Sequence, residues 1–282
     1  MTAAVPGSGA PRKRSELALR VVSSLVLAPV AVAAVYMGTP WFDLLIAVLA
    51  VLMAMEWARM AWGAAYVQPG FTIAVVSLFA VGLANQGHGV AIVAGIGVAL
   101  LAAIAVDRAG PDRRRTWIMG GVACIAVPCA AMIWLRGSAA GGFGVVLWLM
   151  LTVWGTDIAA YAVGRTIGGP KLAPAISPGK TWSGLAGGMA GAGAISAAVI
   201  AWFGFGADAV LLGVLLGAVT ALVAQAGDLF ESGVKRRFGA KDSGTLIPGH
   251  GGVLDRLDGL LAAAPVTAAV LWFWGGEFPT WR

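Results

Sequence analysis

Four acidic residues in the C-terminal part of the sequence are spaced so that they could hold a metal ion. Asp228 and Glu231 end one apolar segment, and Asp255 and Asp258 begin the next. Residues three apart share one face of a helix, so each pair presents two carboxylates together. Carboxylate oxygens are the ligands that Mg²⁺ prefers, with remaining positions left for water and substrate phosphate. The alternative for the second pair is helix capping, because acids also suit a helix N-terminus.

The segment that joins these acids, KRRFGAKDSGTLIPGHGGVLDRLD (235–258), combines cations with a glycine-rich turn. Lysine and arginine neutralise phosphate charge, and glycines let backbone N–H groups converge on an anion. His250 lies in the turn and is a candidate phosphate contact or general base. Together these are the parts of a phosphoryl- or nucleotidyl-transfer site, where positioning and charge neutralisation supply most of the catalysis.

A second polar segment, GRTIGGPKLAPAISPGKTWSG (164–184), offers another anion-binding turn with Lys180, Thr181 and Ser183. It is not a P-loop, because the first glycine of that motif would fall at position 174, which is Pro174. This departure argues against an ATP-hydrolysing Walker fold.

Asp157 lies inside an apolar segment, where charged residues are costly and usually functional. Tyr161 and Arg165 follow at intervals of four, so the three residues share one helix face. We expect either one wall of a polar site or a structural ion pair. Glu56 and Arg59, three apart in another apolar segment, are interpreted as a plain structural pair.

The elements that must position these residues are membrane-spanning helices. Of the 282 residues, 59% are hydrophobic and only 11% are charged, with a mean hydropathy of +0.86. A soluble domain has about 25% charged residues. The two cysteines, Cys124 and Cys129, lie within an apolar run and are interpreted as small buried residues. The sequence therefore predicts an all-α polytopic transmembrane helical bundle.

Nine apolar segments are predicted to span the bilayer, although eight is also compatible with the pattern. The third is short enough to be re-entrant or interfacial. The segments are 17–37, 41–58, 71–84, 89–106, 117–135, 142–164, 184–203, 209–230 and 257–275.

Basic residues test this arrangement. With a cytoplasmic N-terminus and alternating spans, every Lys and Arg except Arg136 and Arg282 falls on the cytoplasmic side. The positive-inside rule predicts such a bias. It also accounts for the net charge of +6 without a nucleic-acid partner. We expect a flexible cytoplasmic tail (1–16), N-terminal helices (17–140) and a catalytic region (141–282) with cytoplasmic loops 164–184 and 231–256.

The residues from Ser232 to Asp258 resemble the signature of the phosphatidate cytidylyltransferase family, also called CDP-diacylglycerol synthases. Thirteen positions match in order and spacing: Ser232, Lys235, Arg236, Lys241, Asp242, Gly244, Pro248, His250, Gly251, Gly252, Asp255, Arg256 and Asp258. The segments SPGKTWSG and DIAAYAVGR are also similar to cytoplasmic elements of that family. The resemblance covers residues 150–265, whereas the first 140 residues match only in their multi-span character.

The resemblance implies a reaction of CTP with phosphatidate that gives CDP-diacylglycerol and pyrophosphate for phospholipid synthesis. It implies Mg²⁺, with K⁺ as a second cation, an inner-membrane location with a cytoplasmic site, and a homodimer. Asp228, Asp255 and Asp258 are the implied metal ligands. The implied phosphate and nucleotide contacts and other site residues are Lys235, Arg236, Lys241, Asp242, His250, Arg256, Ser177, Lys180, Thr181, Ser232, Gly251, Gly252 and Asp157.

Two alternative functions stay open. A polyprenol- or phytol-type lipid kinase would also use a nucleotide, but it would need a base to activate the lipid hydroxyl. A secondary transporter could use Asp157 and Asp228 as ion sites, yet transporters place such acids near the midplane of repeated halves. Here the acids cluster at one end, beside long basic loops.

Overall fold

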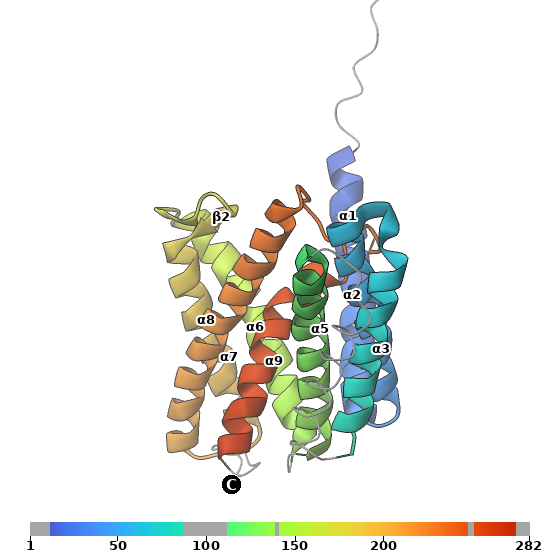
Figure 1. The fold of residues 1–282 in the computed structure, drawn as a ribbon. Helices are drawn as coiled ribbons and strands as arrows, with labels where there is room; N and C mark the ends of the chain where they lie inside the picture. The colour runs from blue at the N-terminus through green and yellow to red at the C-terminus, as the bar shows by residue number, and fades with distance from the viewer. Residues whose placement is uncertain (1–11, 87–111, 139–140, 248–250, 275–282) are drawn as a thin grey trace, which may run out of the picture.

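Eight α-helices make up most of the chain that the structure describes (Figure 1). The structure is a computed structural model, and it describes residues 12–86, 112–138, 141–247 and 251–274. The helices are α1 (Arg12–Met37), α2 (Trp41–Trp62), α3 (Val67–Ala84), α5 (Asp112–Ser138), α6 (Gly142–Thr166), α7 (Trp182–Trp202), α8 (Ala207–Arg237) and α9 (Leu254–Phe273). A short 3-10 turn, η1 (Gly63–Ala65), links α2 to α3.

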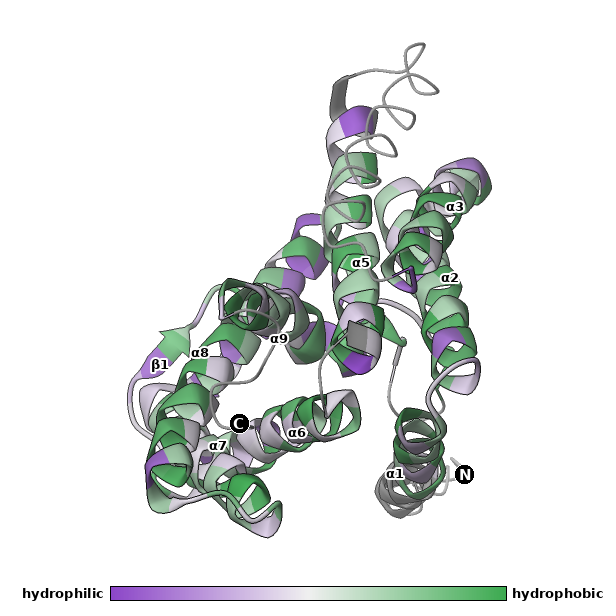
Figure 2. Ribbon diagram, turned by 90° about the horizontal axis from the view of Figure 1, so that it is seen from below, coloured by the Kyte–Doolittle hydropathy of each residue, from purple (hydrophilic) through white to green (hydrophobic). Residues whose placement is uncertain are grey.

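Seven of these helices are long and apolar enough to cross a membrane: α2, α3, α5, α6, α7, α8 and α9. Helix α1 contains a shorter apolar stretch, Leu25–Met37. Apolar residues dominate the helices when the bundle is viewed end-on (Figure 2). The predicted all-α membrane bundle is therefore confirmed. The predicted span 89–106 lies outside the described residues, so the total of nine stays a prediction, as does the cytoplasmic N-terminus.

The third apolar helix is longer than its predicted span. It begins at Val67 and has 18 residues, so the interpretation of a short segment at 71–84 was wrong. The prediction started after Pro69, but proline is tolerated in the first turn of a helix, where the backbone N–H has no helical partner in any case.

A small β-hairpin interrupts the otherwise helical chain between α6 and α7. Strands β1 (Lys171–Ala173) and β2 (Ser177–Thr181) pair antiparallel, with Lys171 opposite Thr181. The sequence predicted only a loop over residues 164–184. Gly168 and Gly169 adopt φ of +67° and +105°, which favours glycine and stops α6 before the hairpin.

Helices α6, α7 and α8 pack closely because small residues lie where they touch. A Cβ atom on Gly217 of α8 would lie 2.6 Å from the carbonyl oxygen of Ala192 in α7. The indole of Trp148 in α6 donates to Ser196 Oγ at 2.7 Å, and that hydroxyl donates to the Gly213 carbonyl at 2.6 Å. Small interfacial residues permit this close approach of helices in lipid.

Helices α2, α3 and α5 form a second group, and α5 lies between them and α9 (Figure 2). Trp57 of α2 is 2% exposed and donates from its indole to the Trp117 carbonyl of α5 at 2.9 Å. Helix α8 ends before Gly239, whose φ is +68°, and the chain then crosses to the start of α9. The two groups of helices thus meet beside the predicted site.

Candidate active site

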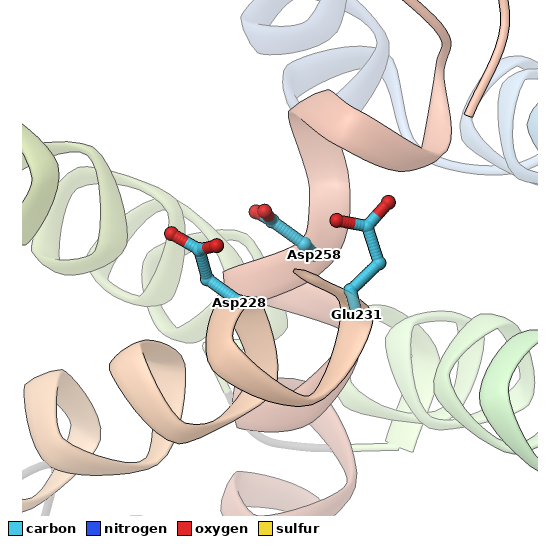
Figure 3. A group of neighbouring side chains, drawn as sticks. All are labelled: Asp228, Glu231 and Asp258. Atoms are coloured by element: carbon cyan, nitrogen blue, oxygen red, sulfur yellow. The ribbon is translucent and has the colours of Figure 1, made fainter. Parts of the chain in front are cut away.

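Three carboxylates from two helices converge at the predicted site (Figure 3). Asp228 and Glu231 project from successive turns of α8, and Asp258 projects from α9. One oxygen from each lies within 4.8 Å of the others. Like charges this close repel each other, so the arrangement needs a cation to offset them. Hard oxygen donors at this spacing suit a divalent ion.

Two lysines already lie against this acidic cluster, which we define as Asp228, Glu231 and Asp258. Lys180 Nζ in β2 is 2.6 Å from Asp228 Oδ2. Lys235 Nζ, one turn after Glu231, is 2.6 Å from Glu231 Oε2 and 2.6 Å from Asp255 Oδ1. Lys235 is buried, so these contacts are little screened by water. The compensating cations near α8 are thus Lys180 and Lys235.

Asp255 lies beside the acidic cluster and is joined to it through Lys235. Its Oδ2 accepts hydrogen bonds from Ser243 N and Gly252 N, both at 2.8 Å, and from Ser243 Oγ at 2.9 Å. Its Oδ1 accepts from Lys235 at 2.6 Å. Among the described residues, the group with metal-binding spacing contains Glu231 and not Asp255. The metal role that the resemblance implies for Asp255 stays a prediction.

A polar cavity of about 650 Å³ opens next to the acidic cluster. The predicted helix face of Asp157, Tyr161 and Arg165 lines one wall, and Gln225 Nε2 lies 3.5 Å from Asp157 Oδ1. Other charged or polar lining residues come from the hairpin, α8, the segment after α8, and α9: Lys171, Lys180, Thr181, Asp228, Lys235, Asp242, Asp255, Arg256 and Asp258. Cations and carboxylates therefore face one volume.

Among the described residues, the other predicted site residues do not line this cavity. Ser232 Oγ donates to Asp228 Oδ1 at 3.2 Å, and Ser177 lies at the start of β2. Arg236 donates to the carbonyls of Ile176 at 3.3 Å and Ala240 at 3.1 Å, which ties the end of α8 to the hairpin. Lys241 is exposed, and His250 lies outside the described residues.

Two glycines of the turn before α9, Gly251 and Gly252, lie next to Asp255. Gly251 adopts a φ of +83°, and its carbonyl accepts a hydrogen bond from Ile247 N at 2.9 Å. Gly252 N donates to Asp255. These glycines shape the turn that leads into α9.

An apolar cavity of about 240 Å³ lies on the other side of the acidic cluster. Its walls come from α2, α5, α8 and α9, and two carboxylates, Glu231 and Asp258, reach its edge. The apolar lining residues include Trp57, Cys124, Pro128, Phe230, Leu254, Leu261 and Pro265. Asp258 lines both cavities, so the acidic cluster separates a polar volume from an apolar one.

The sequence analysis underrated two residues. Glu231 was recognised on the helix face of Asp228 but left out of the predicted ligand set. Glu56 was interpreted as a partner of Arg59, and that was wrong: Arg59 donates to the Tyr66 hydroxyl at 2.9 Å, whereas Glu56 accepts from Val253 N at 2.9 Å and Leu254 N at 3.0 Å. No local spacing could have linked Glu56 to residues almost two hundred positions away.

Comparison with known proteins decides the family. The sequence model of the cytidylyltransferase family matches residues 18–274. The chain belongs to this family. A protein of Brucella suis biovar 1 (strain 1330) that is named phosphatidate cytidylyltransferase is 39% identical over 271 residues, covering 94% of this chain and 95% of the relative. A Pseudomonas aeruginosa protein of the same name is 37% identical over 270 residues, covering 92% and 98%. The family resemblance inferred from the signature is thereby confirmed.

A relative with lower sequence identity carries the same name. A Rickettsia bellii protein, also named phosphatidate cytidylyltransferase, is 30% identical over 262 residues and covers 90% of both chains. The family match begins at residue 18, so it includes most of the first 140 residues, where the signature-based resemblance was only general.

Proposed function

We propose that this protein transfers the cytidylyl group of CTP to phosphatidate and releases pyrophosphate. The observation that carries the proposal is the position of the acidic cluster, between a charged cavity and an apolar one. We assign the nucleotide to the first and the part of the lipid next to its headgroup to the second, so that their phosphates would meet at the carboxylates. The names of relatives that match nearly the whole chain support the same reaction.

The reaction is a nucleophilic displacement at phosphorus. A phosphate oxygen of phosphatidate attacks the α-phosphorus of CTP and forms a new phosphoanhydride bond. The bond between the α-phosphorus and the oxygen that bridges to the β-phosphorus breaks, and its electron pair leaves with pyrophosphate. The attacking phosphate is already anionic, so no side chain has to remove a proton. The protein's task is to position two anions and offset their charge.

The cations that line the polar cavity would hold the triphosphate. Lys171 and Lys180 reach it from the hairpin, Arg165 from α6 and Arg256 from α9. We assign Thr181 to the same nucleotide site, because its hydroxyl accepts from Gly184 N at 3.0 Å and fixes the start of α7 at the cavity wall. Arg236 would act by fixing the hairpin against α8. Ser177, Lys241 and His250 stay predicted substrate contacts.

The acidic cluster would hold the divalent ion, which we take to be Mg²⁺. Three carboxylate oxygens within 4.8 Å of one another fit a hard cation, and they leave coordination positions for phosphate oxygens. When bound, the ion would neutralise charge on the reacting phosphates. Lys235 would set the orientation of Glu231 and keep Asp255 apart from the cluster. A second cation, K⁺, stays a prediction.

We place the active site at the cytoplasmic face of the bacterial inner membrane. Basic residues gather on the loops at the site end, as the positive-inside rule requires of cytoplasmic loops. The division into a tail (1–16), N-terminal helices (17–140) and a catalytic region (141–282) belongs to the same proposal. The homodimer that the resemblance implies stays a prediction.

The proposed reaction is tested by following two labels of CTP into lipid. Purified protein receives phosphatidate, a polyprenol, Mg²⁺ and CTP labelled at either the α- or the γ-phosphorus. Chloroform-soluble product should carry the α-label only, and the γ-label should appear in pyrophosphate. Transfer of γ-label to a lipid alcohol would replace the proposal with a lipid kinase, and the absence of any labelled lipid would refute both.

A further inference from the structure

Glu56 is a buried acid that the reaction described above does not use. It lies in α2 with 8% of its surface exposed, yet it contacts a segment almost two hundred residues further along the chain. Its Oε1 accepts from Val253 N at 2.9 Å, and its Oε2 accepts from Leu254 N at 3.0 Å and Ser243 Oγ at 3.2 Å. These N–H groups belong to the start of α9, where an anion is favoured.

A continuous network runs from Glu56 to the acidic cluster. Ser243 N donates to Asp255 Oδ2, and the Ser243 hydroxyl lies between the two carboxylates, 2.9 Å from Asp255 Oδ2 and 3.2 Å from Glu56 Oε2, so they share its one proton. Asp255 binds Lys235, and Lys235 binds Glu231. Asp258 stands one turn after Asp255 on α9. Glu56 thus contacts the first turn of the helix that carries one metal-binding carboxylate, and it is linked by four contacts to another.

Two glycines of the signature are explained by the same side chain. A Cβ atom on Gly244 would lie 2.7 Å from Glu56 Oε1 and 3.0 Å from its Cδ. A Cβ atom on Gly252 would lie 2.6 Å from Glu56 Oε2, and it would also meet the Ser243 hydroxyl. Neither φ is positive, so the constraint on these positions comes from the hydrogen-bonded Glu56 carboxylate and, at Gly252, also from the Ser243 hydroxyl. The loop before α9 is therefore shaped around Glu56.

We propose that Glu56 is a positioning residue that sets α9 and the loop before it, so that Asp258 meets the acids of α8. It lines neither the polar nor the apolar cavity, so it acts through other residues and not on substrate. A buried carboxylate is costly unless it is hydrogen-bonded, and all three of its donors come from this loop and the start of α9. The kinetic part of this inference rests on the proposed function.

The kinetic test compares Glu56→Gln with Asp43→Asn, a control that removes an acid from the other end of α2. An amide cannot accept from both N–H groups and the hydroxyl as the carboxylate does. We expect kcat to fall about tenfold and the Mg²⁺ concentration at half-maximal rate to rise, with KM for CTP changed less than about twofold, as displaced catalytic groups predict. Asp43→Asn should match wild type. Unchanged kcat and Mg²⁺ dependence in Glu56→Gln would overturn the positioning role.

Thermal unfolding and the variant Glu56→Asp distinguish a positioning role of Glu56 from a purely structural one. If Glu56→Gln lowers kcat only in proportion to the folded fraction, the residue stabilises the fold and nothing more. Glu56→Asp keeps the charge and should recover part of the lost kcat. A failure of Glu56→Asp to exceed Glu56→Gln in kcat would count against the proposal.

A double-mutant cycle tests the packing around Glu56 without using the reaction. Gly244→Ala should lower the unfolding temperature in wild type, because its new methyl group meets the carboxylate. In the Glu56→Asp background the shorter side chain leaves room, so the same substitution should cost much less. Gly233→Ala is the control, because the nearest atom to its added Cβ would be 4.0 Å away. Additive changes in unfolding temperature would overturn the packing claim. The measurement does not depend on the proposed reaction.

Discussion

Lys180 Nζ lies 2.6 Å from Asp228 Oδ2, and this contact joins the β-hairpin to the acidic cluster. Both side chains also line the polar cavity. The hairpin therefore places the Lys180 side chain where a triphosphate would meet the Asp228 carboxylate. Lys180 can offset the charge of Asp228 in the free protein and turn to phosphate when nucleotide binds.

Replacement of Lys180 tests this role of the hairpin. Lys180→Met should lower kcat/KM for CTP by about a hundredfold, the range seen when one charge-stabilising group is removed. Steady-state kinetics with varied CTP would measure it. Arg237→Gln, which removes an exposed cation at the end of α8, should behave as wild type. Equal losses of kcat/KM in the two variants would mean that the effect comes from net charge and not from the contact with Asp228.

Lys235 should matter for folding as well as for catalysis. It is buried between Glu231 and Asp255, and its removal leaves two carboxylates without their shared cation. Breaking a buried ion pair by removing one partner costs about 3–5 kcal/mol. We therefore expect Lys235→Met to unfold at a clearly lower temperature than wild type in the same detergent. An unchanged unfolding temperature would show that the network contributes little to stability.

The apolar cavity should affect the binding of phosphatidate and not the binding of CTP. Leu261→Trp fills part of its volume and should raise KM for phosphatidate several-fold while leaving KM for CTP unchanged. Leu215→Trp, at a position of α8 that is 59% exposed, provides the control for added bulk. Assays in mixed micelles with varied phosphatidate would compare the two. A rise in KM for CTP instead would mean that the cavity does not hold lipid.

Labelling from the two sides of the membrane tests the orientation. With Cys124 and Cys129 replaced by Ala, Arg237→Cys marks the site end and Trp202→Cys marks the exposed end of α7, next to the start of α8. A membrane-impermeant maleimide should label Trp202→Cys in intact spheroplasts and Arg237→Cys only in inverted vesicles. The reverse pattern would place the site outside the cytoplasm.

The sequence predicted the helices and the general location of the site because both leave local signals. Apolar segments of bilayer length marked α2 and α5 to α9, and acids inside them marked Asp157 and Asp228. The hairpin was missed, because its strands are too short to show an alternating pattern. The start of α3 lies at Val67, four residues before the predicted span.

The composition of the acidic cluster could not be predicted from spacing. Asp228 and Glu231 share a face of α8, and Asp255 and Asp258 share a face of α9, so four acids were equally placed. Ser243 and Gly252 donate to Asp255 Oδ2, whereas Lys235 contacts both Asp255 and Glu231. The carboxylates that lie together are those of Asp228, Glu231 and Asp258. Which acids converge depends on how α9 is rotated against α8. In our proposal that rotation is set by the contacts of Glu56 with the start of α9, which are tertiary.

The most direct test of the account is the Mg²⁺ dependence of α-label transfer from CTP to phosphatidate in wild type, Asp258→Asn and Glu231→Gln. Wild type should show saturable activation by Mg²⁺. Asp258→Asn should lose at least about a hundredfold in kcat, and Glu231→Gln should need more Mg²⁺, because each removes a charged ligand from the acidic cluster. Wild-type rates and Mg²⁺ dependence in both variants would contradict the assignment of the catalytic metal to this cluster.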